Sequence, residues 1–202
     1  MTALPSQDDL RDAALRKARE SAETIDRFFA EHAPRIAACA RALGEAFDRG
    51  GRLFAMGNGG SACDAAHVAV ELMHPILEKR PALPAIALSL DAPLLTAIAN
   101  DQDFSRGFAG QLRVLARPGD VALGISTSGK SASVIRALQA AREMGLVTVG
   151  FAGRDGGKMP GVCDHAFVVQ SFSTHRIQEV HTTLLHVLWD LIHVSRGQED
   201  TI

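Results

Sequence analysis

The sequence predicts an α/β fold built on a parallel β-sheet, on the strength of two observations. From residue 51 onward, short apolar runs alternate with stretches whose apolar side chains have helical spacing. The runs also lack the polar alternation of a strand with one face in water, as expected for parallel strands buried on both faces. Strands that alternate with helices form a parallel sheet through right-handed crossovers. The five predicted strands are RLFAMG, PAIALSL, DVALGIS, LVTVGFAG and HAFVVQ.

The helices follow in order along the chain. Residues 8–49 have apolar side chains at helical spacing, and we expect Pro34 to divide them into two helices. Four more helical stretches alternate with the strands, and the one at about 93–115 is either one helix or two short helices. The predicted ranges are about 61–75, 93–115, 130–144 and 175–195.

The last helix is expected to be buried on more than one side. Its apolar residues cover more than one face, which predicts packing against both the sheet and another subunit. These residues are Leu184, Leu185, Leu188, Leu191 and Ile192.

A single domain is expected. The chain has 202 residues, of which 47% are hydrophobic and 22% charged, an ordinary composition for one globular domain. No linker or internal repeat divides it. We therefore predict one domain at 1–202, with an N-terminal helical segment at 1–50 and an α/β core at 51–195.

Charge and cysteine content argue against several classes of protein. A formal net charge of −2 gives no reason to expect nucleic acid or a membrane as a partner. No window reaches the roughly 18 uncharged apolar residues of a membrane span, and the N-terminus is charged. The cysteines at 39, 63 and 163 are widely spaced, which indicates neither a disulfide framework nor a thiolate zinc site. We expect a cytoplasmic protein.

Two loops that follow predicted strands have the residues of a phosphate site. GNGGSA and STSGKSAS each lie directly before a predicted helix. Backbone N–H groups at a helix N-terminus attract anions, and hydroxyl groups add donors. The alternative is that the serines only cap helices. The ending SGKS resembles that of a nucleotide P-loop, but we do not expect a nucleoside triphosphate site. Repeated glycines and four clustered hydroxyls favour an anion site, and these are Ser126, Thr127, Ser128 and Ser131.

Histidine and carboxylate side chains at helical spacing suggest a metal or catalytic site. His67 and Glu71 are four residues apart and share one face of a helix. Gln178 and His186 are eight residues apart and can share a face of the last helix, where His181 could substitute for either. Imidazole and carboxylate groups suit zinc. A solvated pair is the alternative, and spacing alone does not decide between them.

Taken together, these segments resemble the phosphoheptose isomerases, a branch of the sugar isomerase (SIS) domain family. The resemblance covers roughly residues 10–195. It implies a three-layer α/β fold around a five-stranded parallel sheet, and a homotetramer with active sites between subunits. The implied activity converts sedoheptulose 7-phosphate to D-glycero-D-manno-heptose 7-phosphate through an enediol, for bacterial surface polysaccharides. The motifs are GNGGSACDAAHVAVEL, RPALPAIALSLD, TAIANDQDF, GDVALGISTSGKSASVIRAL, DGGKM and RIQEVHTTLLHVL.

The resemblance also implies roles for individual residues. Glu71 and His186 match the catalytic base and acid of the family. The zinc ligands, for one ion per subunit, match His67, Glu71, Gln178 and His186. The positions that match substrate contacts are Asn58, Gly59, Gly60, Ser61, Glu71, Asn100, Asp101, Ser126, Thr127, Ser128, Ser131 and Gln178.

Two alternatives accompany this reading. A related branch that associates with a replication initiator keeps the fold but lacks the carboxylate and the late histidine, whereas this chain has Glu71 and His186. The chain also departs from the isomerases at Pro75, where they commonly have an arginine. Loss of that guanidinium leaves open an isomerase for a related sugar phosphate.

Overall fold

A five-stranded parallel sheet forms the centre of the computed structural model, which describes residues 4–76 and 79–200. The strand order is β2-β1-β3-β4-β5, and every neighbouring pair is parallel. All five predicted strands are present, and all six residues of the central strand β3 are buried, as expected for a strand covered on both faces. The bounds are β1 Leu53–Gly57, β2 Ala85–Ala87, β3 Val121–Ser126, β4 Val147–Gly153 and β5 His165–Val169.

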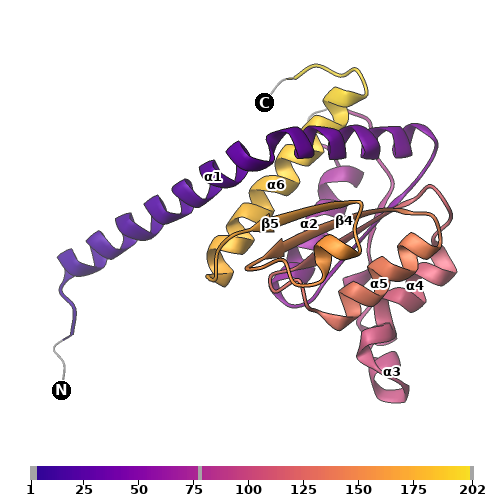
Figure 1. The fold of residues 1–202 in the computed structure, drawn as a ribbon, viewed down its shortest axis with the longest axis horizontal. Helices are drawn as coiled ribbons and strands as arrows, with labels where there is room; N and C mark the ends of the chain where they lie inside the picture. Colours follow the sequence, from indigo (N-terminus) through magenta and orange to yellow (C-terminus); the bar gives the residue numbers. More distant parts are fainter. Residues whose placement is uncertain (1–3, 77–78, 201–202) are drawn as a thin grey trace.

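Helices cover both faces of the sheet, which confirms the three-layer architecture (Figure 1). Alternate residues of β1 show the division, because Leu53 and Ala55 pack in one hydrophobic cluster and Phe54 and Met56 in the other. The first cluster lies under α1 (Gln7–Asp48), α2 (Gly60–Met73) and α6 (Thr174–Ser195). The second lies under α4 (Gly107–Leu115) and α5 (Ala132–Glu143). The other helices are α3 (Ala92–Asp101) and the 3₁₀ turns Leu88–Leu90, Phe104–Arg106 and Met159–Gly161.

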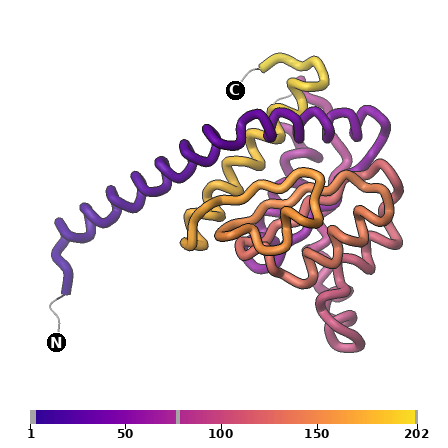
Figure 2. The backbone as a smooth tube through the Cα atoms, viewed as in Figure 1, coloured from indigo at the N-terminus to yellow at the C-terminus, as the bar shows by residue number. Residues whose placement is uncertain are grey.

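The N-terminal segment is one helix, so the prediction of two helices divided by Pro34 was wrong. The helix α1 has 42 residues and begins at a capping box formed by Ser6 and Asp9. Pro34 removes one backbone donor from the helix interior, which usually kinks or breaks a helix. The buried side chains Phe28 and Ile36 lie on either side of it, so packing against the rest of the protein maintains the helix. Figures 1 and 2 show that the axis of α1 changes direction and that its N-terminal part projects beyond the body.

Within the chain, the last helix packs against α1, α2 and the sheet. Its apolar residues belong to the cluster that α1 and α2 complete, in which Leu184, Leu185, Leu188 and Ile192 are buried. Leu191 is partly buried against the same cluster. Packing against α1 and α2 therefore accounts for much of the apolar surface of α6, and the contact with another subunit stays a prediction.

None of the helices in the described part of the chain combines the length and the apolar character needed to cross a bilayer.

Candidate active site

The helix α2 begins directly after β1 and runs beside α6. Its N-cap, Gly59, has φ +57°, a left-handed conformation that glycine adopts at low cost. At Gly60, a Cβ atom would lie 2.2 Å from Nε2 of Gln178, so the two helices approach closely only because this residue has no side chain. The glycines of the first loop thus start α2 and let α6 pack against that start.

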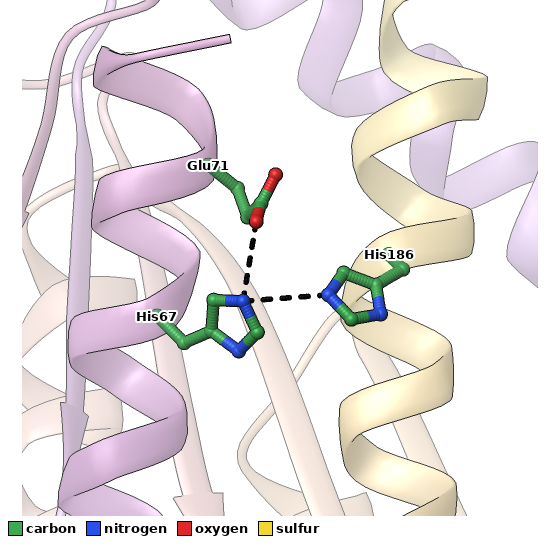
Figure 3. A group of neighbouring side chains, drawn as sticks. All are labelled: His67, Glu71 and His186. Atoms are coloured by element: carbon green, nitrogen blue, oxygen red, sulfur yellow. Dashed lines mark hydrogen bonds and ion pairs between the residues drawn. The ribbon is translucent and has the colours of Figure 1, made fainter. Parts of the chain in front are cut away.

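His67, Glu71 and His186 meet where these two helices face each other (Figure 3). Nε2 of His67 lies 3.1 Å from Oε1 of Glu71 and 3.4 Å from Nε2 of His186. Figure 3 shows His67 between the other two side chains, with the second carboxylate oxygen of Glu71 directed away from it. Two helices that are far apart in sequence therefore bring one carboxylate and two imidazoles to a single point.

The geometry of this group fits a zinc ion. One ligand atom from each of the three residues lies within 4.8 Å of the others. Ligand atoms bound to a tetrahedral zinc ion at about 2.0–2.1 Å lie about 3.3–3.4 Å apart, close to the separation of the two Nε2 atoms. Nitrogen and carboxylate oxygen are ligands that zinc accepts. The side chains are thus arranged to share an ion with little rearrangement.

The surroundings of the group are mixed in polarity. Glu71 borders a cavity of about 20 Å³ whose other walls are apolar, among them Leu72, Phe151 and Trp189. One turn before His67 on α2, burial raises the pKa of Asp64. Glu71 therefore lies at the edge of an apolar region of the core.

The serine loop lies at the carboxyl end of β3, between that strand and α5. Ser126 ends the strand and Ser131 is the N-cap of α5, with Thr127 and Ser128 in the turn between them. Oγ of Ser128 accepts a hydrogen bond from the backbone N–H of Lys130 at 3.2 Å and lies 3.5 Å from Oγ of Ser126. The four hydroxyls predicted to form an anion site thus surround one turn.

Asn58 joins the two loops. Its Nδ2 donates hydrogen bonds to Oγ of Ser131 at 2.7 Å and to Oγ of Ser133 at 3.0 Å. Ser61 is buried in the first turn of α2, and its N–H donates to the carbonyl of Asn58 at 3.1 Å. The two hydroxyl-rich loops therefore form one surface, as expected for loops after the adjacent strands β1 and β3.

Sequence reasoning missed two serines that support this surface. Ser133 shares the Asn58 amide with Ser131. Ser89 both donates to the carbonyl of Gly57 at 2.8 Å and accepts from its N–H at 3.1 Å, which fixes the end of β1. Ser133 is within the serine-rich run and could have been included, whereas Ser89 gave no signal because its partner is distant in sequence.

The second loop has the complete spacing GxxxxGKS of a nucleotide P-loop, with Gly124 as its first glycine. Spacing alone therefore gave no ground for setting that motif aside, but the structure does. Gly124 lies inside β3, and a Cβ atom there would be 2.7 Å from side chains of Val134 and Leu138. Nζ of Lys130 is 3.1 Å from Asp155 in an exposed ion pair. The glycine allows α5 to pack on the sheet, and the lysine is directed to a neighbouring loop.

Three further candidates lie apart from the histidine group. Asn100 and Asp101 are exposed at the end of α3, which Figure 1 shows extending away from the sheet, and they bond to each other at 2.8 Å. Gln178 rests against Gly60 at the start of α2.

His181 does not substitute for Gln178 or His186, as the sequence had suggested it could. Its side chain is fully buried, and Nε2 lies 3.1 Å from the carbonyl of Ala152 on β4. Burial lowers the pKa of His181 to about 4, so the ring is neutral at pH 7. This histidine faces the sheet because its position on α6 differs from that of His186 by five residues, which places the two on different faces.

Comparisons with known proteins agree with this fold. A family model described as SIS domain matches residues 18–153. The phosphoheptose isomerase of Solidesulfovibrio magneticus is 50% identical over 173 residues, which are 86% of this chain and 84% of that protein. The phosphoheptose isomerase of Aquifex aeolicus is 45% identical over 174 residues, covering 86% of this chain and 91% of that protein.

Solved structures give the same assignment. The phosphoheptose isomerase of Neisseria gonorrhoeae superposes with a TM-score of 0.85 at 37% identity, covering 91% of this chain and 98% of that chain. That of Francisella tularensis superposes with a TM-score of 0.81 at 32% identity, covering 90% and 98%. Together with the fold and the family model, these likenesses show that the chain belongs to the SIS domain family and, within it, to the phosphoheptose isomerases.

Proposed function

We propose that this isomerase converts sedoheptulose 7-phosphate to D-glycero-D-manno-heptose 7-phosphate, with Glu71 and His186 moving the protons. The proposal rests on one observation: Glu71 and His186, from separate helices, both contact the side chain of His67. An aldose–ketose isomerase needs a base and an acid at adjacent carbons, and a carboxylate beside an imidazole supplies both.

The phosphate is assigned to the surface formed by the two loops. The partial positive charge at the N-termini of α2 and α5 favours an anion there, and the hydroxyls of Ser61, Ser126, Thr127, Ser128 and Ser131 add donors. His67 follows Gly60 by about two helical turns, a rise of roughly 10 Å. An extended seven-carbon chain with bonds of about 1.5 Å has a comparable length. A sugar held by its phosphate at the loops thus places its carbonyl end near the histidine group.

The proton transfers follow from this placement. Glu71 takes a proton from C1 of the open-chain ketose while His186 donates one to the carbonyl oxygen at C2, which gives the neutral enediol. Removal of the proton on O1 and delivery of a proton to C2 then produce the aldose. No atom is gained or lost. Positioned acid and base groups of this kind each contribute on the order of 10² to 10⁴ in rate.

Zinc is the cofactor that best fits the donor set, with one ion per subunit. His67, Glu71 and His186 would hold it, with Gln178 as a fourth ligand once its side chain turns from Gly60. When bound, the ion would stabilise the negative charge that develops on the substrate oxygens while the enediol forms and collapses. Because Glu71 has two oxygens and only Oε1 faces His67, the carboxylate can contact an ion and still present an oxygen to C1.

Assembly of several copies is part of the proposal. In the single chain, α3 has no buried residue although it is apolar, and Leu10 and Leu15 are exposed on the projecting part of α1. A homotetramer would cover these surfaces and bring Asn100 and Asp101 to the site of a neighbouring subunit. The cysteines are widely spaced in the sequence and indicate no disulfide framework, which supports a cytoplasmic location. There the product would enter the synthesis of bacterial surface polysaccharides.

A non-catalytic protein that binds a replication initiator is the competing function. The relatives reported above are isomerases, and the base, the acid and the third potential ligand all face one point. Both observations favour catalysis. Isomerisation of a related sugar phosphate is a second candidate, because Pro75 takes the place of the expected arginine.

The test is incubation of the purified protein with sedoheptulose 7-phosphate, with and without a chelator, followed by analysis of the product. We expect formation of the heptose phosphate and its loss after chelation. Glu71→Gln should abolish turnover but leave substrate binding, whereas Glu143→Gln, a control at the end of α5 across the sheet, should have no effect. Unchanged turnover by Glu71→Gln would remove the assignment of the base, and turnover of a different sugar phosphate only would replace the substrate.

A further inference from the structure

The backbone carbonyl of Glu71 cannot be satisfied within its own helix. In an α-helix this carbonyl would accept a hydrogen bond from the N–H of residue 75, which is Pro75 and has none. The neighbouring carbonyls have backbone partners, because Val70 accepts from His74 at 2.8 Å and Leu72 accepts from Leu83 at 2.7 Å. Pro75 therefore leaves a gap in the hydrogen bonding at the residue that carries the catalytic carboxylate.

A tryptophan of α6 occupies that gap. Nε1 of Trp189 donates a hydrogen bond to the carbonyl of Glu71 at 2.7 Å, and the side chain of Trp189 is buried. Trp189 follows His186 by three residues, so both lie on neighbouring turns of one helix. The indole thus ties the last turn of α2 to the same stretch of α6 that presents His186.

Buried groups hold the indole ring in place. The guanidinium carbon of Arg80 lies 4.7 Å from the centre of the Trp189 ring, and the ring of His193 packs edge-on at 5.1 Å. Arg80 is itself fixed, because its Nη2 is 2.5 Å from Oδ1 of Asp190 and 3.1 Å from the carbonyl of Glu199. The side chain of Arg80 is only 3% exposed. The donor is therefore held in a rigid setting rather than on a mobile side chain.

We propose that Trp189 is a positioning residue of the isomerase. Its indole N–H replaces the backbone N–H that Pro75 removes, and so fixes Glu71 relative to His67 and His186. This inference rests on the role proposed for Glu71. Trp189 thus compensates for the departure from the family at residue 75. A helix that ends two residues after its catalytic carboxylate needs an external donor to keep its last turn from fraying.

The test is a double-mutant cycle on Trp189 and Pro75. Trp189→Phe keeps an aromatic ring against Arg80 but removes the donor together with one of the two fused rings, and we expect about a tenfold lower kcat with a nearly unchanged KM. Zn²⁺ affinity, measured by competition with a chromogenic chelator, should fall by about the same factor. Pro75→Ala restores an N–H at position 75 and allows α2 to extend past its present C-cap, His74, so the double variant should recover most of the kcat and of the Zn²⁺ affinity.

Two controls separate positioning from a general loss of stability. Thr183→Val removes a different hydrogen bond of α6, from Thr183 to the carbonyl of Glu179, and should leave both readouts unchanged. If the phenylalanine variant folds poorly, benzothienylalanine at position 189 replaces it in the test. This residue has nearly the shape of tryptophan without the N–H, and it should lower kcat and Zn²⁺ affinity by the same factors. Urea unfolding of each variant shows whether the fold is retained.

The proposal is overturned if loss of the indole N–H leaves kcat and Zn²⁺ affinity at wild-type values, or if Pro75→Ala fails to restore them. Failure of the proposed function would look different. If Glu71→Gln retained full turnover while the cycle still held for Zn²⁺ affinity, the contact would stand as a positioning device and the base would have to be another residue.

Discussion

His181 shows how one residue type serves unrelated purposes within a single helix. While His186 faces the site, His181 is buried against β4, and burial lowers its pKa from 6.5 to about 4. Between these two values the unfolded chain binds a proton that the native protein does not bind. Stability due to this histidine is therefore complete above pH 6.5 and is lost as the pH falls toward 4.

We predict that the free energy of unfolding falls by about 3 kcal/mol on account of His181 between pH 6.5 and 4. Urea unfolding at a series of pH values measures this slope. His181→Gln, which keeps a donor for the carbonyl of Ala152, should flatten it, whereas His175→Gln at an exposed position should not. An equally steep slope in His181→Gln would assign the pH dependence to other groups.

Arg80 is expected to matter for stability as well as for the site. It forms a buried ion pair with Asp190, and removal of one partner leaves an uncompensated buried charge. We predict that Arg80→Ala lowers the free energy of unfolding by about 3 kcal/mol. The comparison is Arg49→Ala, which breaks an exposed pair with Glu45 at 3.9 Å and should cost less than about 1 kcal/mol. Equal effects in urea unfolding would contradict the importance of the buried pair.

The sequence identified part of the site because part of it is local. The pairing of His67 with Glu71 follows from a four-residue spacing on one helix, and the structure confirms their contact. His186 was connected to them only through resemblance to a family, since no spacing rule links residues 119 positions apart. Trp189 was missed for the same reason, because its bond to Glu71 depends on how two helices pack.

Among the elements, α1 is where local rules and packing disagree. Pro34 is a reliable sign of a helix end in an isolated segment, yet the helix continues through it from Gln7 to Asp48. Four of the five strands were predicted closely because burial on both faces produces uninterrupted apolar runs, whereas the run PAIALSL is a strand only at Ala85–Ala87 and continues as a 3₁₀ turn. Helix breaks are harder to predict, since contacts with α6 on both sides of the proline contribute more than the one backbone bond that it removes.

Replacement of Pro34 measures how much the missing backbone hydrogen bond lowers the free energy of unfolding. Pro34→Ala restores a backbone donor in the helix interior, and we predict an increase of about 1 kcal/mol or more in the free energy of unfolding. Urea unfolding is the measurement, with Ala37→Gly on the same helix as a variant expected to act in the opposite direction. Destabilisation by Pro34→Ala would show instead that the change of direction in α1 is required for its packing.

For the whole molecule, the layers and the five parallel strands agree with the prediction from the sequence, but a single chain does not reveal how copies assemble. Alternation of strands and helices fixes a parallel sheet with helices on both faces. The state of assembly was inferred from the family, because exposed apolar residues indicate an interface without showing how many copies meet.

We predict that Leu10→Glu combined with Leu15→Glu lowers the mass of the particle in solution. The two side chains are 59% and 49% exposed on the projecting part of α1, so charges there disrupt an interface but no core of the single chain. Light scattering after size exclusion measures the mass. Val114→Glu, on α4 at 84% exposure, is the control. Equal masses for the wild type and the double variant would place the interface elsewhere.

The packing of α1 on α6 also bears on how the protein is made. The ribosome synthesises α1 first and α6 last, yet side chains of both complete one hydrophobic cluster. Until the final helix emerges, the nascent chain leaves the inner face of α1 without its cover, which is the kind of surface that chaperones bind. This layer can close only after translation is nearly complete, so a message truncated before codon 174 would yield an aggregation-prone product rather than a smaller domain.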